Sequence, residues 1–177
     1  MHRLFVAIRP PEAIRNQLLD LMGGVSGARW VGEDQMHLTL RFIGEVDRHL
    51  ANDVHAALAG VRQTPFEIAL SGLGAFERRG ETKVLWAGVA PHEALKALRK
   101  KVDQALARTG LEAERRAFHP HVTLARLGRG AGPLGPLLES AGGVTSPPFR
   151  VAEFRLYESR LTPDGAIHSV VQRYPLG

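Results

Sequence analysis

The chain has 177 residues, a length that suits one ordinary domain, and its 44% apolar content is enough for a packed core. It contains no cysteine, which excludes disulfides, a thiol nucleophile and a cysteine-based zinc site, and which favours a cytoplasmic protein. No run of eighteen apolar residues is present, so we expect no membrane-spanning helix. The formal net charge of +5 favours anionic partners such as nucleic acid, although an arginine-rich composition does not by itself indicate RNA binding.

The first half of the sequence predicts two strands and two helices. Residues 2–8 read as a strand that Pro10-Pro11 ends, and these prolines open a helix whose apolar residues recur at helical spacing. Residues 25–35 are expected to form a loop, and a helix with one apolar stripe is predicted from about 47 to 62. Between them lies a strand, because β-branched and aliphatic residues alternate there before a glycine.

The second half predicts a hairpin, a long helix and three further strands, interrupted by one stretch rich in glycine and proline. The expected elements are hairpin strands at 65–74 and 82–90, a helix from Pro91 to about 109, a strand at 117–128, a surface excursion at 129–148 with at most a short helix near 134–140, and final strands at about 149–161 and 167–174. Strands do not alternate regularly with helices, and no glycine-rich phosphate loop is present. We therefore predict an α+β protein of mostly antiparallel sheet.

One short segment occurs twice in the chain. The copies are His37-Leu38-Thr39-Leu40 and His121-Val122-Thr123-Leu124, and each reads as a strand. Side chains two positions apart share a face of a strand, so each copy places an imidazole beside a hydroxyl and turns its aliphatic residues toward the core. A chance duplication of this pattern is on the order of a one-in-a-thousand event. We therefore predict that the two strands bring two His–Thr pairs to one substrate.

These residues resemble the 2H phosphoesterases, which are named for two His-x-Thr motifs, and among them the RNA 2′,3′-cyclic phosphodiesterase family, also called the 2′-5′ RNA ligase family. The resemblance runs almost from end to end. Besides the motifs it includes Arg3-Leu4-Phe5-Val6-Ala7-Ile8, Arg29-Trp30-Val31, Phe118-His119-Pro120, Phe154-Arg155-Leu156-Tyr157-Glu158-Ser159 and Tyr174-Pro175-Leu176. One departure is His168, which stands where the family usually has an aromatic residue, most often tyrosine.

The resemblance implies a single bilobal 2H phosphoesterase domain over residues 1–177. Its fold would be two pseudo-symmetric lobes of mostly antiparallel sheet with outer helices and a central cleft, to which each lobe contributes one motif. The implied activity opens the cyclic phosphate to the 2′-phosphate, with His37 as proton donor to the 3′-oxygen and His121 as proton acceptor from water. The residues alone leave these two roles open, because the motifs are nearly symmetric. Imidazoles that titrate near neutral pH suit acid–base catalysis, and Thr39 and Thr123 can donate hydrogen bonds to the phosphate oxygens.

Two arginines and a third histidine are candidates for substrate binding. Strict alternation places Arg41 on the same face as the first motif's histidine, whereas it places Arg126 on the face opposite His121. The family's Thr-Leu-Ala-Arg ending points to Arg126, and a bulge or the strand end could turn that side chain inward. His119 shares a face with His121 and is interpreted as a cleft neighbour. A zinc-binding pair of these two histidines is the alternative, but neither motif contains a carboxylate.

We therefore expect metal-free catalysis without a cofactor, in a monomer that acts on RNA ends or nucleotides with a 2′,3′-cyclic phosphate and binds no membrane. The reverse reaction, which joins such an end to a 5′-hydroxyl, would use the same acid and base, so the sequence leaves the direction open. The alternative from another class is a non-catalytic RNA-binding module that uses the same basic cleft. No aromatic signature of an RNA-recognition motif and no KH-type loop supports it.

Overall fold

The computed structural model describes residues 1–177, and it confirms the predicted α+β class. Four α-helices and one short 3-10 helix accompany nine strands. In chain order the elements are β1 (His2–Ile8), α1 (Glu12–Leu21), β2 (Ala28–Trp30), η1 (Glu33–Gln35), β3 (Leu38–Val46), α2 (Arg48–Leu58), β4 (Phe66–Arg78), β5 (Glu81–Ala90), α3 (Glu93–Ala107), β6 (His121–Leu127), α4 (Gly135–Ala141), β7 (Phe149–Val151), β8 (Glu153–Thr162) and β9 (Gly165–Pro175). None of the helices has the length and apolar character needed to cross a membrane.

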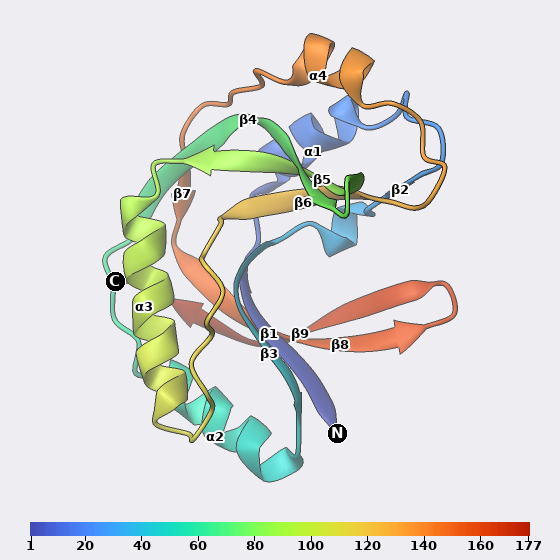
Figure 1. Cartoon of the computed structure of the whole chain (residues 1–177). Coiled ribbons are helices and arrows are strands. Elements are labelled where there is room, and N and C mark those ends of the chain that lie inside the picture. Colours follow the sequence, from blue (N-terminus) through green and yellow to red (C-terminus); the bar gives the residue numbers. More distant parts are fainter.

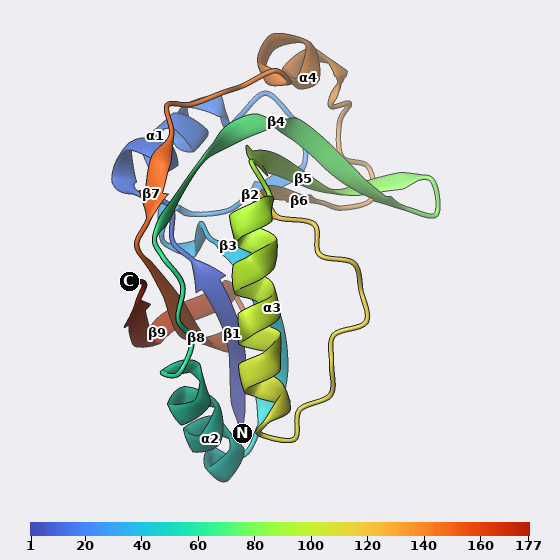
Figure 2. The same ribbon diagram turned by 90° about the vertical axis from the view of Figure 1, so that its left-hand side faces the viewer.

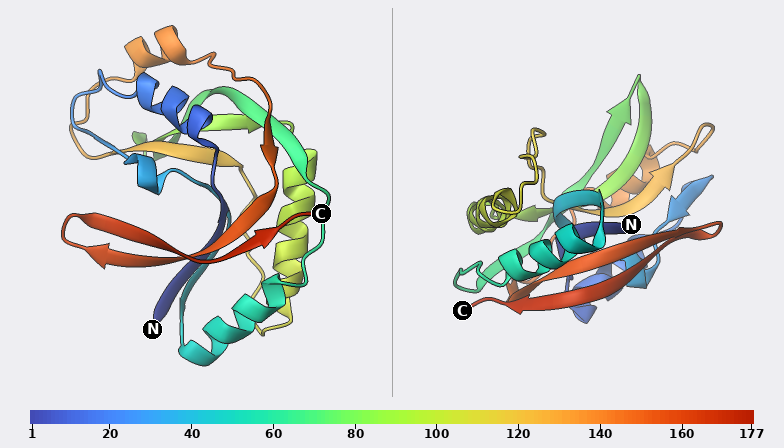
Figure 3. Two further views of the ribbon diagram at one scale, coloured as in Figure 1. Left: turned by 180° about the vertical axis from the view of Figure 1, so that it is seen from behind. Right: turned by 90° about the horizontal axis from the view of Figure 1, so that it is seen from below.

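The strands form one strongly curved sheet in which every pairing is antiparallel. Their order is β7-β4-β5-β6-β3-β1-β8-β9, and β2 pairs with β6 beside this path. Figure 1 shows β4, β5 and β6 curving above the lower group of β1, β3, β8 and β9, and Figure 3 shows the same curl from behind. We call the group β3, β1, β8 and β9 the first lobe, and β2, β4, β5, β6 and β7 the second lobe. The lobes join where β3 pairs with β6, through the residue pair Leu38 and Val122.

The helices cover the outer side of this sheet. Helix α3 packs against β3, α2 packs against both α3 and β1, and α4 packs against β4 (Figure 2). The apolar stripe predicted for the long helix is buried as expected, with Leu95, Leu98, Val102 and Leu106 all inaccessible to solvent. One cluster of 33 buried residues includes the pair Leu38 and Val122 at the junction, so the two lobes share a core.

Several boundaries differ from the sequence-based expectation. The expected strand at 149–161 is divided into β7 and β8, which pair with different strands, and the first hairpin strand extends to Arg78. The expected loop at 25–35 contains the short strand β2 and the 3-10 helix η1, because residues 28–30 find hydrogen-bonding partners in β6. The expected strand at 117–128 begins only at His121, and the helix expected to reach 62 ends at Leu58. The predicted hairpin is confirmed, with Arg79 (φ 54°) and Gly80 (φ 77°) in the left-handed conformation at its tip.

Candidate active site

Both motif strands carry a bulge at the same place. In the pairing of β1 with β3, Val6 faces Arg41 and the next residue, Ala7, faces Thr39, so Leu40 has no partner. In the pairing of β5 with β6, Leu85 faces Ala125 and Trp86 faces Thr123, so Leu124 has no partner. The extra residue follows the threonine of the motif in both strands, and from there on it reverses which side chains face the core.

The bulge in β3 determines the face of the sheet on which Arg41 lies. Because of the bulge, Arg41 lies on the core face with Val6 rather than on the face of the first motif, and it is only 6% exposed. Its Nη1 atom donates a hydrogen bond to Asp103 Oδ1 at 2.8 Å, and its Nη2 donates to the carbonyl of Glu112. The guanidinium thus holds α3 and the segment after it against β3, and its donors are engaged by the protein.

The matching bulge has the opposite consequence for Arg126. Leu124 and Ala125 are both buried, and Arg126 is exposed on the face that carries His121 and Thr123. The inward turn that a bulge could produce is therefore present. The corresponding position of the first motif strand is occupied by Phe42, which is 40% exposed.

The antiparallel junction between the lobes brings the two motifs together. Because Leu38 pairs with Val122, continuing the register by one residue in each direction places Thr39 opposite His121, and His37 opposite Thr123. Each histidine therefore lies near the threonine of the other motif. The site consists of two His–Thr pairs related by a local two-fold axis.

The same hydrogen bond orients both imidazoles. His37 Nδ1 lies 2.7 Å from the carbonyl oxygen of Gln35, and His121 Nδ1 lies 2.6 Å from the carbonyl oxygen of His119. A carbonyl can only accept, so each Nδ1 carries the proton. The Nε2 atom of each ring therefore carries a free lone pair when the ring is neutral and can donate a proton when the ring is protonated. His119 thus supports the second motif through its backbone.

Aromatic rings surround each histidine. The ring of His37 lies 4.8 Å from Phe5 and 5.4 Å from His168, measured between ring centroids. The ring of His121 lies 4.9 Å from Phe76 and 5.9 Å from His119. His168 replaces an expected aromatic residue, and its Nδ1 atom is buried without a hydrogen-bond partner.

Sequence reasoning missed the aromatic neighbours Phe5, Phe76 and Trp86. Each lies in a strand on the face of the motif residues, but its place there depends on cross-strand register. The need for space around one of these rings is visible at Gly74, where a Cβ would approach the Trp86 ring to 2.3 Å. Gly74 faces Trp86 directly in the β4–β5 pairing, and glycine leaves room there for the indole.

Burial and neighbouring charges favour neutral imidazoles in the free protein. Burial lowers the pKa of His37 to about 4, and the nearby His168 and His121 would oppose its protonation further. Burial also lowers the pKa of His121, assisted by the charges of His119 and Arg126. Both Nε2 atoms therefore present lone pairs near neutral pH until an anion is bound between them.

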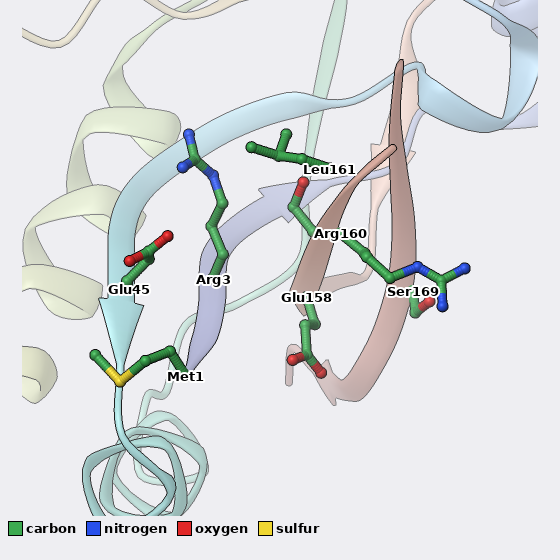
Figure 4. A pocket seen from close by; sticks show the side chains of 8 residues that line it. Met1, Arg3, Glu45, Glu158, Arg160, Leu161 and Ser169 are labelled. Atoms are coloured by element: carbon green, nitrogen blue, oxygen red, sulfur yellow. The ribbon is translucent and has the colours of Figure 1, made fainter. Parts of the chain in front are cut away.

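A cavity of about 320 Å³ opens beside the two motifs. Thr39 and His121 line it together with a set of aromatic side chains and three arginines, namely Phe42, Phe76, Phe118, His119, Arg41, Arg99 and Arg116. A second cavity, of about 550 Å³, lies at the amino-terminal end of β1 and contains no motif residue. Figure 4 shows that its arginines, Arg3 and Arg160, point to different sides, so it lacks convergent donors.

The predicted site residues thus divide into two groups. The strand register places His37, Thr39, His121, Thr123 and Arg126 on one face of the sheet. Arg41 starts from the opposite face, but it lines the cavity together with Thr39, His119 and His121. Two pairs of histidine rings lie close together in this region, His37 with His168 and His119 with His121. No group of three His, Cys, Asp or Glu side chains converges in the chain.

Known proteins share both the sequence and the fold. The sequence profile of the 2′-5′ RNA ligase superfamily matches residues 10–162. The RNA 2′,3′-cyclic phosphodiesterase of Aeropyrum pernix is 39% identical over 144 residues, which cover 80% of this chain and 82% of that protein. The protein of the same name from Escherichia coli is 30% identical over 184 residues, covering 98% and 96%.

Solved structures agree. The crystal structure of TT0787 of Thermus thermophilus has a TM-score of 0.84 at 26% identity, covering 98% of this chain and 97% of that one. Escherichia coli LigT complexed with 3′-AMP has a TM-score of 0.77 at 30% identity, covering 99% and 98%. The residues matched by the superfamily profile include both His-x-Thr motifs. The chain therefore belongs to the 2′-5′ RNA ligase superfamily of 2H phosphoesterases, as an enzyme of its RNA 2′,3′-cyclic phosphodiesterase branch.

Proposed function

We propose that the enzyme opens the 2′,3′-cyclic phosphate of RNA ends or nucleotides to the 2′-phosphate, with two histidines and no metal. The observation that carries this proposal is the pair of imidazoles fixed through Nδ1, each opposite the threonine of the other motif. This arrangement offers a proton acceptor and a proton donor on opposite sides of one phosphorus atom.

The reaction needs one proton taken and one proton given. His121 Nε2 accepts a proton from water while the water oxygen bonds to phosphorus. Protonated His37 Nε2 donates its proton to the 3′-oxygen as the bond between that oxygen and phosphorus breaks. The products are a 2′-phosphate and a free 3′-hydroxyl, and exchange with solvent restores both histidines.

Neutral and charged donors stabilise the pentavalent transition state. The hydroxyls of Thr39 and Thr123 can donate to the non-bridging oxygens, whose negative charge grows during the reaction. Arg126 lies on the same face and adds a cation that no carboxylate of the protein neutralises. Arg41 is left out of the substrate contacts, because its donors bind Asp103 and the Glu112 carbonyl.

The aromatic cavity supports the direction of opening. It lies on the side of Thr39 and His121, and its phenylalanines suit a stacked base. A base in this cavity places the adjacent 2′-oxygen toward His121 and the 3′-oxygen toward His37. Water that attacks in line from the His121 side then expels the 3′-oxygen, which gives the 2′-phosphate.

His37 must take up its proton from solvent when the substrate binds. Because burial lowers the pKa of His37 to about 4 in the free protein, the neutral form dominates near pH 7. A phosphate anion between the rings favours the protonated imidazole and raises its pKa again. The related Escherichia coli LigT has been solved in complex with 3′-AMP, which supports nucleotide binding by this chain.

The same groups serve the reverse reaction. A 5′-hydroxyl of a second RNA strand in place of water would give a 2′-5′ phosphodiester from the cyclic end, by microscopic reversibility. We propose ligation as a secondary activity that depends on how well the cleft holds two RNA ends.

Phosphorus NMR of hydrolysed adenosine 2′,3′-cyclic phosphate tests the function. We expect a single product, the 2′-phosphate, at the same rate before and after dialysis against EDTA. Absence of turnover would leave a protein that only binds RNA, the alternative of another class. A 3′-phosphate or a mixture would refute the pose, and an EDTA-inactivated enzyme rescued by zinc or manganese would refute metal-free catalysis.

A further inference from the structure

A third imidazole stands beside one of the two motif histidines. The ring of His168 lies 5.4 Å from the ring of His37, measured between centroids, and the two planes are at 87°. His168 is in β9, opposite Ser159 of β8. Gln35 ties this strand to η1 through a 2.6 Å hydrogen bond from its Nε2 atom to the carbonyl of Ala166. Two segments far apart in the sequence are thus held so that their imidazoles lie side by side.

The ring of His37 is oriented as a metal ligand would be. Its Nδ1 atom donates to the carbonyl of Gln35 at 2.7 Å, so Nε2 carries the lone pair of the neutral ring. Histidines that bind a metal are usually fixed in this way, through a hydrogen bond from the second ring nitrogen to a carbonyl or a carboxylate. Burial also lowers the pKa of His37 to about 4, so protons do not compete for the lone pair near pH 7.

The ring of His168 has a nitrogen that the protein does not use. Its Nδ1 atom is buried and has no hydrogen-bond partner. A buried polar atom without a partner commonly costs about 1–3 kcal/mol, so a ligand for this nitrogen stabilises the site. The χ2 torsion of histidine has broad minima, and rotation about it can turn either nitrogen toward the neighbouring ring.

The separation of the two rings fits a shared metal ion. A zinc–nitrogen bond is about 2.0–2.1 Å long, and the centroid of an imidazole lies about 1.1 Å behind the nitrogen, so two rings that share one tetrahedral zinc ion have centroids about 5.2 Å apart. His37 and His168, at 5.4 Å, are close to this value. The pair His119 and His121 is wider, at 5.9 Å, and His119 packs against the ring of Trp86.

The charges around the first pair also suit a cation. Burial lowers the pKa of His168, and the carboxylate of Asp34 lies near enough to oppose that shift. The charge of Arg9 reaches His37, but its guanidinium is engaged by Glu33 at 3.0 Å. Imidazole nitrogens select zinc, copper and nickel over magnesium and calcium, which prefer oxygen ligands.

We propose that His37 and His168 form a binding site for a first-row transition metal such as Zn²⁺, and that the bound metal inhibits the enzyme. The two imidazoles supply two ligands, and water or the substrate phosphate completes the coordination. The Nε2 atom of His37 that binds the metal is the atom that must carry the proton for the 3′-oxygen, so a loaded site has no proton donor. The metal blocks the reaction and takes no part in it. The inhibition, though not the metal site itself, rests on the proposed function.

Inhibition by zinc chloride, measured with adenosine 2′,3′-cyclic phosphate, tests this proposal. The variants are His168→Phe, which keeps a flat ring beside Phe5 but has no nitrogen, and His119→Gln, which removes a ring of the other pair. His49→Ala, which removes an exposed histidine of α2, is the control. Each rate is divided by the metal-free rate of the same protein, so that differences in basal activity do not enter the comparison.

We expect about 100 μM Zn²⁺ to slow the wild type about tenfold, as for a dissociation constant of about 10 μM, and EDTA to restore the rate. His168→Phe should need about 10–100-fold more zinc for the same inhibition. His119→Gln and His49→Ala should respond to zinc as the wild type does. Magnesium at about 5 mM should inhibit none of these proteins.

Calorimetry measures the metal site without turnover. Titration with Zn²⁺ should show one site in each wild-type chain, and that site should be lost in His168→Phe. A wild type that zinc does not inhibit, equal inhibition of wild type and His168→Phe, or inhibition that His119→Gln abolishes would each overturn the site. If the wild type hydrolysed no cyclic nucleotide, the proposed function would fail, whereas the calorimetric result would still decide the metal site.

Discussion

Each motif histidine donates its Nδ1 proton to the backbone carbonyl two residues earlier, so only Nε2 can reach a substrate. The surroundings nevertheless differ. His37 packs against Phe5 and His168, and burial lowers its pKa to about 4, whereas His121 lies near Phe76 and Arg126. The two positions are alike in hydrogen bonding and unlike in electrostatics, which allows one to act as acid and the other as base.

Substrates with different leaving groups separate the two roles. His37→Ala and His121→Ala should each lower kcat for a cyclic nucleotide by about 10²–10⁴-fold. A phosphodiester with a p-nitrophenolate leaving group needs no proton, so it should restore activity to His37→Ala and leave His121→Ala inactive.

His49→Ala serves as the control, because this histidine is exposed on α2 away from the cleft, and its rate should equal that of the wild type. Rescue of His121→Ala in place of His37→Ala would exchange the roles. Near-normal turnover by either cleft variant would end the two-histidine mechanism.

The pH dependence follows from the direction of the pKa shifts. The proposed mechanism needs His37 protonated and His121 neutral. In the free protein His37 becomes protonated as the pH falls toward its pKa of about 4. His121 loses its proton as the pH rises through its own pKa, which burial holds below 6.5. The fraction of free enzyme that meets both conditions is largest between these values. We therefore expect kcat/KM, which reports the free enzyme, to peak at mildly acidic pH and to fall toward pH 8.

In the substrate complex the phosphate anion raises both pKa values, so the kcat profile should lie at higher pH than the kcat/KM profile. Both profiles can be measured from pH 4 to 9 with adenosine 2′,3′-cyclic phosphate. A kcat/KM that kept rising to pH 8 would contradict this order of protonation.

At the scale of the elements, the bulge after each motif threonine determines which face of the sheet the following residues occupy. In β6 the bulge exposes Arg126 on the catalytic face, and in β3 it buries Arg41 behind that face. Two copies of one motif are thus followed by an exposed cation in one lobe and by a buried structural anchor in the other.

The anchor can be tested by stability. Arg41→Met should lower the free energy of unfolding by about 1–3 kcal/mol, since it removes charge-assisted hydrogen bonds to Asp103 and to the Glu112 carbonyl. The loss is limited because Asp103 keeps its second partner, Arg99. Denaturant unfolding measures this difference.

Lys100→Met on the exposed side of α3 is the matched control and should change stability by less than about 0.5 kcal/mol. If Arg41→Met were as stable as wild type but bound the cyclic nucleotide poorly, Arg41 would be a substrate ligand after all.

At the scale of the whole molecule, one core runs through both lobes. The cluster of 33 buried residues includes Leu38 of the first lobe and Val122 of the second, which pair at the junction. Outside it lies only a small cluster of three buried residues in the first lobe, Phe5, Ala7 and Tyr157. We therefore propose that the chain is a single bilobal domain that unfolds in one cooperative step.

The natural fluorophores can test this cooperativity. Both tryptophans, Trp30 and Trp86, lie in the second lobe, and both tyrosines, Tyr157 and Tyr174, lie in the first. Tryptophan fluorescence, tyrosine absorbance and far-UV circular dichroism should show coincident denaturant midpoints. Separate midpoints for the tryptophan and tyrosine signals would show that the lobes unfold independently.

The sequence alone determined the elements and the chemistry of the motifs. Apolar periodicity predicted α3 and its buried stripe, and the duplicated His-x-Thr segment predicted two strands that each carry a histidine and a threonine on one face. These inferences succeed because helix and strand periods are local properties that a few neighbouring residues set.

Only the tertiary structure decided what depends on pairing between distant strands. Strict alternation predicted Arg41 on the face of the first motif and Arg126 on the face opposite His121, and the bulges exchange these two faces. The rings around His37 and His121, with His168 among them, likewise follow from register. A period of two predicts a shared face only within an unbroken strand, and neither a bulge nor the partner of a strand is encoded in local sequence.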